Sequence, residues 1–242
     1  MSVLKPIYLL ADSQLLFWRN ERGLFLNSVR ASVVNGSPTA AYIGASNGDD
    51  PDSYSIFRAA MESIGIVDCR KVGSSSSTED AGSIAEADII LLAGGDVEKG
   101  WNVFERSGLN ELIVKRYLEG ALLIGVSAGA VQLGLFGWPE TGPSSQNLIS
   151  TFKLIPFIVG VHEEKEDWRI LKQAIRLVDR EIHGIGIPSG AGMIYHVDRS
   201  IEPIRHPLCE FSVRAKKIVR HLLFASAHAD MVEEFAEVPL IA

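Results

Sequence analysis

The chain has 242 residues, of which 47% are hydrophobic and 22% charged, and a formal net charge of −7, values typical of a soluble globular protein. The acidic balance argues against nucleic acid and anionic membranes as partners, because both bind basic patches, and no apolar run approaches the ~18 residues of a membrane-spanning helix. The two cysteines, Cys69 and Cys209, have neither a zinc-site spacing nor a disulfide framework, so we expect reduced thiols in a cytoplasmic protein without metal or cofactor.

The first half of the chain alternates strand-like and helix-like segments. Continuous apolar runs, typical of buried parallel strands, lie at residues 7–11, 40–44, 64–69, 89–93 and 121–126. The first run has no cleavage site of small residues after it, so we interpret it as a strand and not as a signal peptide. Helical spacing of apolar residues marks 52–64 and 103–119. This order predicts right-handed βαβ units in a doubly wound, flavodoxin-like α/β sandwich, with a mostly parallel sheet and helices on both faces.

The second half of the chain is less regular. Residues 134–150 are rich in Gly, Pro, Ser and Asn and are predicted to form a loop, and 163–178 to form an amphipathic helix. Strands are expected at 182–187 and 193–197, with short β-like runs at 211–224 whose apolar edges permit a homodimer. The polar segment 74–77 is interpreted as a linker within the domain. No repeat or shift in composition divides the chain, so we predict a single domain of residues 1–242.

One motif points to a nucleophile. The pattern G-x-S-x-G fits Gly125-Val126-Ser127-Ala128-Gly129. A strand before the serine and a helix after it are the setting of a nucleophile elbow, in which a sharp turn exposes the hydroxyl. The dipole and free N–H groups of the helix N-terminus favour negative charge on a substrate oxygen. A serine that only caps the helix would give the same local sequence, but the context favours a nucleophile at Ser127.

A second motif ends another predicted strand, in Leu92-Ala93-Gly94-Gly95-Asp96. Adjacent glycines at this position let the backbone approach a ligand and offer N–H donors to it. Both motifs are expected at the carboxyl edge of the parallel sheet, where such folds bind ligands. A plain strand-to-helix turn with Asp96 as the helix cap explains the same residues equally well.

A serine nucleophile needs a base, and the histidines are the candidates. There are six, at positions 162, 183, 196, 206, 221 and 228. His162 is slightly favoured because it lies on a predicted loop just before an amphipathic helix. The acidic residues that follow it complement the dipole at the start of that helix. Arg169 is either a clamp for a substrate carboxylate or an ordinary surface arginine.

Taken in order, these pieces resemble the dipeptidase E and cyanophycinase family of serine peptidases. The resemblance spans most of the chain. It rests on the strand and turn at residues 42–47 (Tyr-Ile-Gly-Ala-Ser-Asn), the loop at 92–96, the elbow at 125–130, and a Pro156-containing strand that leads to His162 and is followed by Gly184-Ile-Gly-Ile-Pro188.

The resemblance implies a class I glutamine-amidotransferase-like fold and metal-free cleavage of peptide or isopeptide bonds next to aspartate. It implies that Ser127 is the nucleophile and His162 the base. It also implies that the Gly94-Gly95 loop forms an oxyanion hole together with the N–H of Ala128. Dipeptidase E has an orienting aspartate in the loop after the nucleophile helix. Here that loop offers only Glu140, so the third carboxylate is Glu140 or is absent.

Three positions depart from the family pattern. Val97 replaces a glutamine, Glu163 replaces an aromatic residue, and Ser189 replaces an acidic residue near the end of the Gly-Ile-Pro strand. Carboxylates directly after His162 would repel an aspartyl side chain. We therefore expect a serine peptidase or amidase for a small peptide-like substrate that is not aspartyl, with a non-catalytic binding protein on the same fold as the alternative. A glutamine amidotransferase is disfavoured because it needs a cysteine at the elbow.

Overall fold

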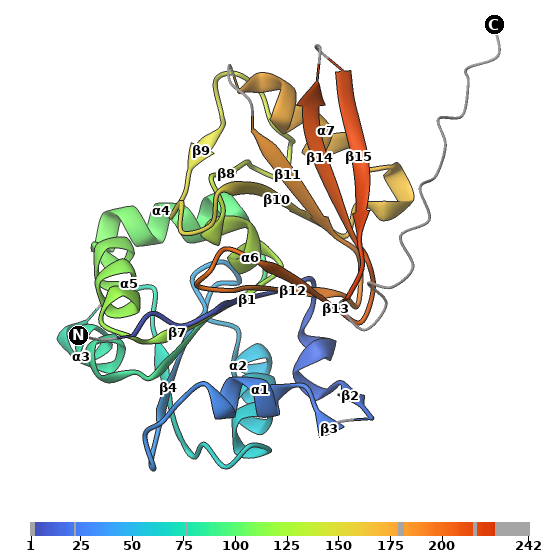
Figure 1. Cartoon of the computed structure of the whole chain (residues 1–242). Coiled ribbons are helices and arrows are strands. Elements are labelled where there is room, and N and C mark those ends of the chain that lie inside the picture. Colours follow the sequence, from blue (N-terminus) through green and yellow to red (C-terminus); the bar gives the residue numbers. More distant parts are fainter. Residues whose placement is uncertain (1–2, 22, 76, 179–181, 215–216, 226–242) are drawn as a thin grey trace, which may run out of the picture.

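The computed structural model describes residues 3–21, 23–75, 77–178, 182–214 and 217–225. Its largest element is a seven-stranded sheet in the order β13-β12-β1-β7-β6-β4-β5 (Figure 1). Five neighbouring strands run parallel: β1 (Ile7–Leu10), β7 (Leu122–Val126), β6 (Ile89–Leu92), β4 (Thr39–Ile43) and β5 (Asp68–Val72). Two antiparallel strands, β12 (Gly192–Tyr195) and β13 (Ile201–Ile204), continue the sheet beyond β1.

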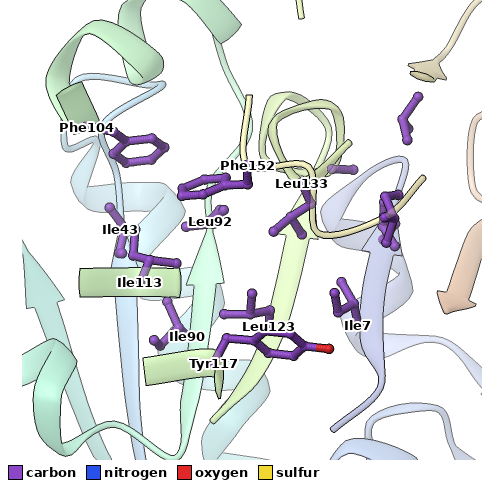
Figure 2. Close-up of a cluster of buried hydrophobic side chains, with 14 of the residues drawn as sticks. Ile7, Ile43, Ile90, Leu92, Phe104, Ile113, Tyr117, Leu123, Leu133 and Phe152 are labelled. Carbon is purple, nitrogen blue, oxygen red and sulfur yellow. The ribbon is translucent and has the colours of Figure 1, made fainter. Parts of the chain in front are cut away.

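Alternate residues of β1 belong to opposite faces of this sheet. Ile7 and Leu9 lie in one buried cluster, whereas Tyr8 and Leu10 lie in another. The first face is covered by α3 (Thr78–Glu86), α4 (Val97–Ser107), α5 (Leu109–Leu118) and α6 (Ala128–Leu133), and the second by η1 (Ser13–Phe17), α1 (Leu26–Ala31) and α2 (Pro51–Glu62). Figure 2 shows the first cluster, to which the loop residue Phe152 contributes its ring. Burial on both faces explains the continuous apolar runs and confirms the predicted α/β fold.

A second sheet of four strands lies beside the first (Figure 1). Its order is β10-β11-β14-β15, with β10 (Phe157–Val161) and β11 (His183–Ile187) parallel and β14 (Leu208–Arg214) and β15 (Lys217–Leu223) antiparallel. Helix α7 (Arg169–Leu177) packs against it through Leu171 and Ile175. Val159 and Ile185 of this sheet join the buried cluster that contains Ile7. The two sheets therefore share one core.

Two predicted elements in the first half have different bounds in the structure. The strand expected at 64–69 is β5, which begins at Asp68. Ile64 and Ile66 are buried, but their N–H groups bond back to Met61 at the end of α2. The helix expected at 103–119 is two helices, because Gly108 between α4 and α5 has a left-handed φ of 71°.

Apolar spacing alone did not predict the exact bounds of several other elements. The helix expected at 163–178 consists of η2 (Glu164–Glu166) followed by α7. The polar linker at 74–77 ends at Ser77, which caps α3 in a reciprocal pair with Asp80. Two short hairpins complete the described elements: β2 (Arg19–Asn20) with β3 (Gly23–Leu24), and β8 (Phe136–Gly137) with β9 (Ile149–Ser150) inside the predicted loop.

Among the described helices, none has both the length and the apolar character needed to cross a membrane. The single domain predicted for residues 1–242 includes 226–242, and the predicted tail strands include 215–216, which lie outside the described residues. That domain assignment stays a prediction.

Candidate active site

Ser127 lies in the turn between β7 and α6. β7 is buried along its whole length between β1 and β6, and the N–H of Ser127 donates to the carbonyl of Leu10 at 2.9 Å. The backbone of Ser127 has φ 49° and ψ −110°, and such conformations cost a non-glycine residue about 1–3 kcal/mol. The Ser127 side chain makes no capping hydrogen bond to α6. Helix capping therefore does not account for this serine, whereas a strained, half-buried hydroxyl matches a nucleophile elbow.

The glycines on either side of Ser127 allow α6 to pack directly on the sheet. A Cβ on Gly125 would lie 2.6 Å from the backbone of Gly129, and a Cβ on Gly129 would lie 2.2 Å from the carbonyl oxygen of Leu92. Contacts this short are not tolerated, so no larger residue fits either position without displacing backbone. The two glycines of the motif thus set how closely the helix N-terminus approaches the ends of β6 and β7.

Gly94 and Gly95 follow β6 and lie against the elbow. A Cβ on Gly94 would lie 3.2 Å from the Cβ of Ser127, and a Cβ on Gly95 would lie 2.3 Å from the carbonyl oxygen of Ser46. Gly95 also has a φ of 128°, which side chains rarely permit. Within the described chain, neither the N–H of Gly95 nor that of Ala128 donates to a backbone carbonyl. Their predicted role in an oxyanion hole requires donors of this kind and stays a prediction.

Asp96 caps the helix that follows this loop. Its Oδ1 accepts a hydrogen bond from the N–H of Lys99 at 2.8 Å, at the first turn of α4. Asp96 also lines a cavity next to Ser127. Both interpretations of the Gly-Gly-Asp turn therefore apply, with the aspartate capping the helix and the glycines approaching the serine.

Gln132 braces the loop and is a residue that the sequence analysis missed. It is fully buried in α6, and its Nε2 donates to the carbonyl of Val97 at 3.0 Å and to Ser46 Oγ at 3.1 Å. These bonds fasten the segment after Gly95 to the helix that begins after Ser127. A single amide in an otherwise apolar helix was the available signal, because a buried amide must find partners.

Ser127 and His162 line the same cavity, of about 390 Å³, although they come from different sheets. Its wall also includes Asp12, Ser13, Tyr42, Asn47 and Ser53 as polar residues, and Leu16, Ile56, Phe57 and Leu91 as apolar ones. Within the described chain no hydrogen bond joins Ser127 to His162. Catalytic pairs are often loose without substrate and tighten when it binds.

Strand register in the second sheet positions His162. β10 and β11 are parallel and pair Val161 with Ile187, so the residues after these two strands lie together. The N–H of His162 donates to the carbonyl of Ile187 at 3.3 Å, and His162 Nδ1 lies 3.2 Å from Ser189 Oγ. The group that contacts the ring is therefore the hydroxyl of Ser189.

The two glutamates after His162 have different partners. Oε2 of Glu163 accepts from the N–H groups of Ile170 and Leu171, both at 3.0 Å, and so caps α7. Burial raises the pKa of Glu163 above its ordinary value, although these N–H groups oppose the shift. Oε1 of Glu164 accepts from the N–H of Ser189 at 3.2 Å. Burial acts to raise the pKa of Glu164, but its hydrogen bonds, chiefly from Ser189, hold that pKa below the ordinary value.

A second cavity, of about 210 Å³, also reaches Ser127. Its wall contains the carboxylates of Asp96, Glu140 and Glu163. Glu140 is exposed, and within the described chain it makes no hydrogen bond to His162. The structure thus places Glu140 on the wall of a cavity, and its role as the orienting carboxylate stays a prediction.

Arg169 lines neither cavity. It is exposed at the start of α7 and pairs with Glu166, its guanidinium lying 3.4 Å from Oε2. In this arrangement it belongs to the solvated face of the helix, and its predicted role as a substrate clamp has no contact that supports it.

Four other histidines lie within the described residues, at positions 183, 196, 206 and 221. None of them lines either cavity at Ser127. His183 contacts Glu210 at 2.8 Å, and His196 contacts Glu202 at 2.9 Å. His228 lies outside the described residues. Among the described histidines, His162 alone shares a cavity wall with the elbow serine.

The two cysteines lie outside the cavities at Ser127. Cys69 and Cys209 are free thiols, and neither lines a cavity next to Ser127. Burial raises the pKa of Cys69 to about 11 and also raises the pKa of Cys209, so neither is an activated thiolate near pH 7. The described residues contain no cluster of His, Cys, Asp and Glu that could hold a metal ion.

β4 and the loop after it contribute two residues to which the sequence analysis gave no role. Asn47 Nδ2 donates to Tyr42 Oη at 2.8 Å, and both side chains line the cavity of Ser127 and His162. The motif at 42–47 signalled this segment, but the pairing of its first and last residues depends on the turn between them.

Comparisons with known proteins agree on one kind of protein. A sequence model of peptidase family S51 matches residues 6–201. The solved structures that match include a peptidase from an acI-B1 Actinobacterium, with 16% sequence identity, a TM-score of 0.63, and coverage of 90% of this chain and 97% of that chain. They also include a Listeria monocytogenes EGD-e protein assigned to peptidase E, with 17% identity, a TM-score of 0.55, and coverage of 91% of this chain and 100% of that chain. No curated protein matches this sequence.

Proposed function

The chain belongs to peptidase family S51 and is a serine-type peptidase, and we propose that it cleaves a small peptide or isopeptide with Ser127 as nucleophile and His162 as general base. The resemblance to dipeptidase E noted from the sequence motifs is confirmed by this membership. The observation that carries the proposal is a cavity lined by both Ser127 and His162. Ser127 belongs to the strained elbow, and His162 follows a strand of the second sheet.

The proposed reaction has an acylation stage and a hydrolysis stage. Ser127 Oγ forms a bond to the substrate carbonyl carbon while its proton passes to His162 Nε2. The carbonyl oxygen gains negative charge, which the N–H groups of Gly95 and Ala128 stabilise by roughly 3 kcal/mol per donor. The C–N bond then breaks, and His162 returns the proton to the leaving amine. Water repeats the sequence on the acyl-enzyme and releases Ser127.

The charges around Ser127 favour substrates that are not acidic next to the scissile bond. Asp12 lines the first cavity, and Asp96, Glu140 and Glu163 line the second, whereas no lysine or arginine among the described residues lines either wall. At an effective dielectric constant of about 20, two like charges 4 Å apart repel by about 4 kcal/mol. We therefore expect the substrate to have a neutral or basic residue next to the scissile bond.

A fluorophosphonate probe tests the nucleophile. Wild-type protein is expected to be labelled at Ser127, as found by peptide mass spectrometry, and Ser127→Ala to lose both labelling and peptide hydrolysis. Ser13→Ala is the matched control, because Ser13 lines the same cavity and should leave labelling intact. If folded wild-type protein is not labelled while a known serine hydrolase is labelled in parallel, a non-catalytic binding protein becomes the better interpretation.

A library of dipeptides and isoaspartyl peptides tests the substrate charge. Peptides that differ only in Asp, Asn or Lys before the scissile bond should give a lower kcat/KM for Asp than for Asn or Lys. A clear preference for Asp would contradict the proposed specificity and leave the nucleophile assignment unaffected, because Ser127→Ala would still abolish hydrolysis.

A further inference from the structure

The ring of His162 is contacted by a serine hydroxyl, whereas in many serine hydrolases a carboxylate contacts the catalytic histidine. Nδ1 of His162 lies 3.2 Å from Ser189 Oγ. A base that takes a proton at Nε2 must carry its own proton on Nδ1, so Nδ1–H must donate to a partner. A hydroxyl can accept this bond, but it can also donate to Nδ1 and so favour the opposite tautomer. Something must therefore fix the direction of the Ser189 hydroxyl.

Ser189 is held in a tight turn at the end of β11. The N–H of Ala191 donates to the carbonyl of Pro188 at 2.9 Å, and Gly190 has a φ of 72°, as the third residue of a type II turn requires. The N–H of Gly190 donates to Asp12 Oδ2 at 2.6 Å, which joins the turn to the segment after β1. Ser189 therefore has little freedom to move away from His162.

Glu164, at the start of η2 after β10, contacts the same turn. Its Oε1 accepts from the N–H of Ser189 at 3.2 Å, and its Oε2 is buried and has no hydrogen-bond partner among the described residues. A buried carboxylate oxygen without a donor is unfavourable. Burial acts to raise the pKa of Glu164, but the side chain and N–H of Ser189 help to lower it.

We propose that Ser189 and Glu164 are positioning residues that together hold His162 in the tautomer able to accept the proton of Ser127. Glu164 is ionised near pH 7 and can only accept hydrogen bonds. The Ser189 hydroxyl therefore donates to Glu164 and presents its lone pairs to His162 Nδ1–H. In this arrangement His162 donates to Ser189, and Ser189 donates to Glu164. The unprotonated Nε2 of His162 can then accept the proton of Ser127.

This inference rests on the proposed role of His162, and kinetics test it directly. Ser189→Ala removes the acceptor and should lower kcat by about 10²-fold with KM changed less than about twofold, because positioning acts on the proton transfer. Glu164→Gln should lower kcat by about tenfold, because an amide can donate to the hydroxyl and reverse its direction. Ser189→Thr should restore kcat to within about threefold of wild type, since it keeps the hydroxyl.

Two further variants separate positioning from general disturbance. Ser189→Asp supplies a carboxylate directly and should retain far more activity than Ser189→Ala. Glu166→Gln is the matched control, because Glu166 belongs to the same short η2 segment but is exposed and pairs with Arg169. Its kcat should equal that of wild type.

The tautomer itself can be observed without substrate. In protein labelled with ¹⁵N-histidine, the imidazole nitrogen shifts of His162, assigned with His162→Ala, should show the proton on Nδ1. Glu164→Gln should shift the population toward Nε2–H. A wild-type ring that carries its proton on Nε2, or unchanged kcat in both Ser189→Ala and Glu164→Gln, would overturn the proposal. In the second case Ser127 labelling of the wild type would show that the proposed peptidase mechanism stands without these residues.

Discussion

The serine side and the histidine side of this site are built in different ways. Ser127 follows β7, which is buried along its whole length in the middle of the larger sheet, and backbone contacts with Leu92 and Leu10 fix the turn. His162 follows β10 in the smaller sheet, is exposed to solvent, and contacts Ser189 through side-chain atoms. The proposed nucleophile is thus positioned by packed backbone, and the proposed base by hydrogen bonds near water.

Because of this difference, substitutions on the two sides should change the folding free energy by different amounts. Forcing extra atoms into packed backbone typically costs 1–3 kcal/mol or more of folding free energy, whereas one hydrogen bond contributes about 1 kcal/mol. Changes at the elbow should therefore affect folding and activity together. Changes around His162 should affect activity with only small losses of stability.

The largest effect is expected from Gly129→Ala. The new Cβ would lie 2.2 Å from the carbonyl oxygen of Leu92, so α6 must move, and we expect a loss of about 3 kcal/mol in the free energy of unfolding together with loss of activity. Urea denaturation measures it. Gly82→Ala is the control, because a Cβ there meets nothing within 4 Å in α3 and should stabilise the helix by up to about 1 kcal/mol. Equal stability of the two variants would contradict the packed elbow.

Ser127→Gly should separate stability from activity at the elbow. Glycine adopts the φ of 49° and ψ of −110° without the strain of a Cβ. We expect the free energy of unfolding to rise by about 1 kcal/mol while labelling and hydrolysis disappear. A variant less stable than wild type in urea denaturation would show that the turn is not strained.

On the histidine side, Glu163→Ala should cost about 1 kcal/mol of stability, because α7 loses the acceptor for the N–H groups of Ile170 and Leu171. Glu163→Gln should cost less, because it keeps an acceptor oxygen and removes a carboxylate whose pKa burial has raised. Thermal and urea denaturation compare the two variants. Equal losses would mean that the charge of Glu163 is essential to the cap.

The smallest effect concerns pH. The pKa of Glu164 in the folded protein lies below its ordinary value of 4.5, so its stabilising contribution is complete above about pH 4.5 and is lost as the pH falls through the folded pKa. The stability difference between wild type and Glu164→Gln should therefore shrink in acid, by less than about 1 kcal/mol. Glu163 has a raised pKa, so the corresponding difference for Glu163→Gln should move in the opposite direction. Parallel pH curves for the two variants would contradict these assignments.

The sequence was most informative where the chemistry is local. The elbow depends on Gly125, Ser127 and Gly129, which are adjacent in the chain, so the motif and its glycines predicted the turn that the structure contains. Four of the five parallel strands, β1, β4, β6 and β7, were found for a similar reason, because burial on both faces requires an apolar run in each strand. The strand at 64–69 was misplaced because two isoleucines buried by a turn look like strand residues.

The partner of His162 depended on contacts that are distant in the chain. Ser189 is 27 residues away from His162, and nothing in either local sequence predicts that they touch. Their meeting follows from the parallel register of β10 and β11. Glu140 was the candidate carboxylate because only the loop after the nucleophile helix was considered. In the structure, Ser189 Oγ contacts the ring of His162, and Glu164 accepts a hydrogen bond from the N–H of Ser189.

By itself, the sequence determined the α/β fold, the serine elbow and the glycine loop next to it, and it slightly favoured His162 as the candidate base. The tertiary structure decided that a second sheet presents that histidine to the serine's cavity, and which side chains contact the ring. The physical reason is one of range. A turn and its packing are specified by neighbouring residues, whereas a hydrogen bond between two strand ends exists only after register and sheet order are fixed.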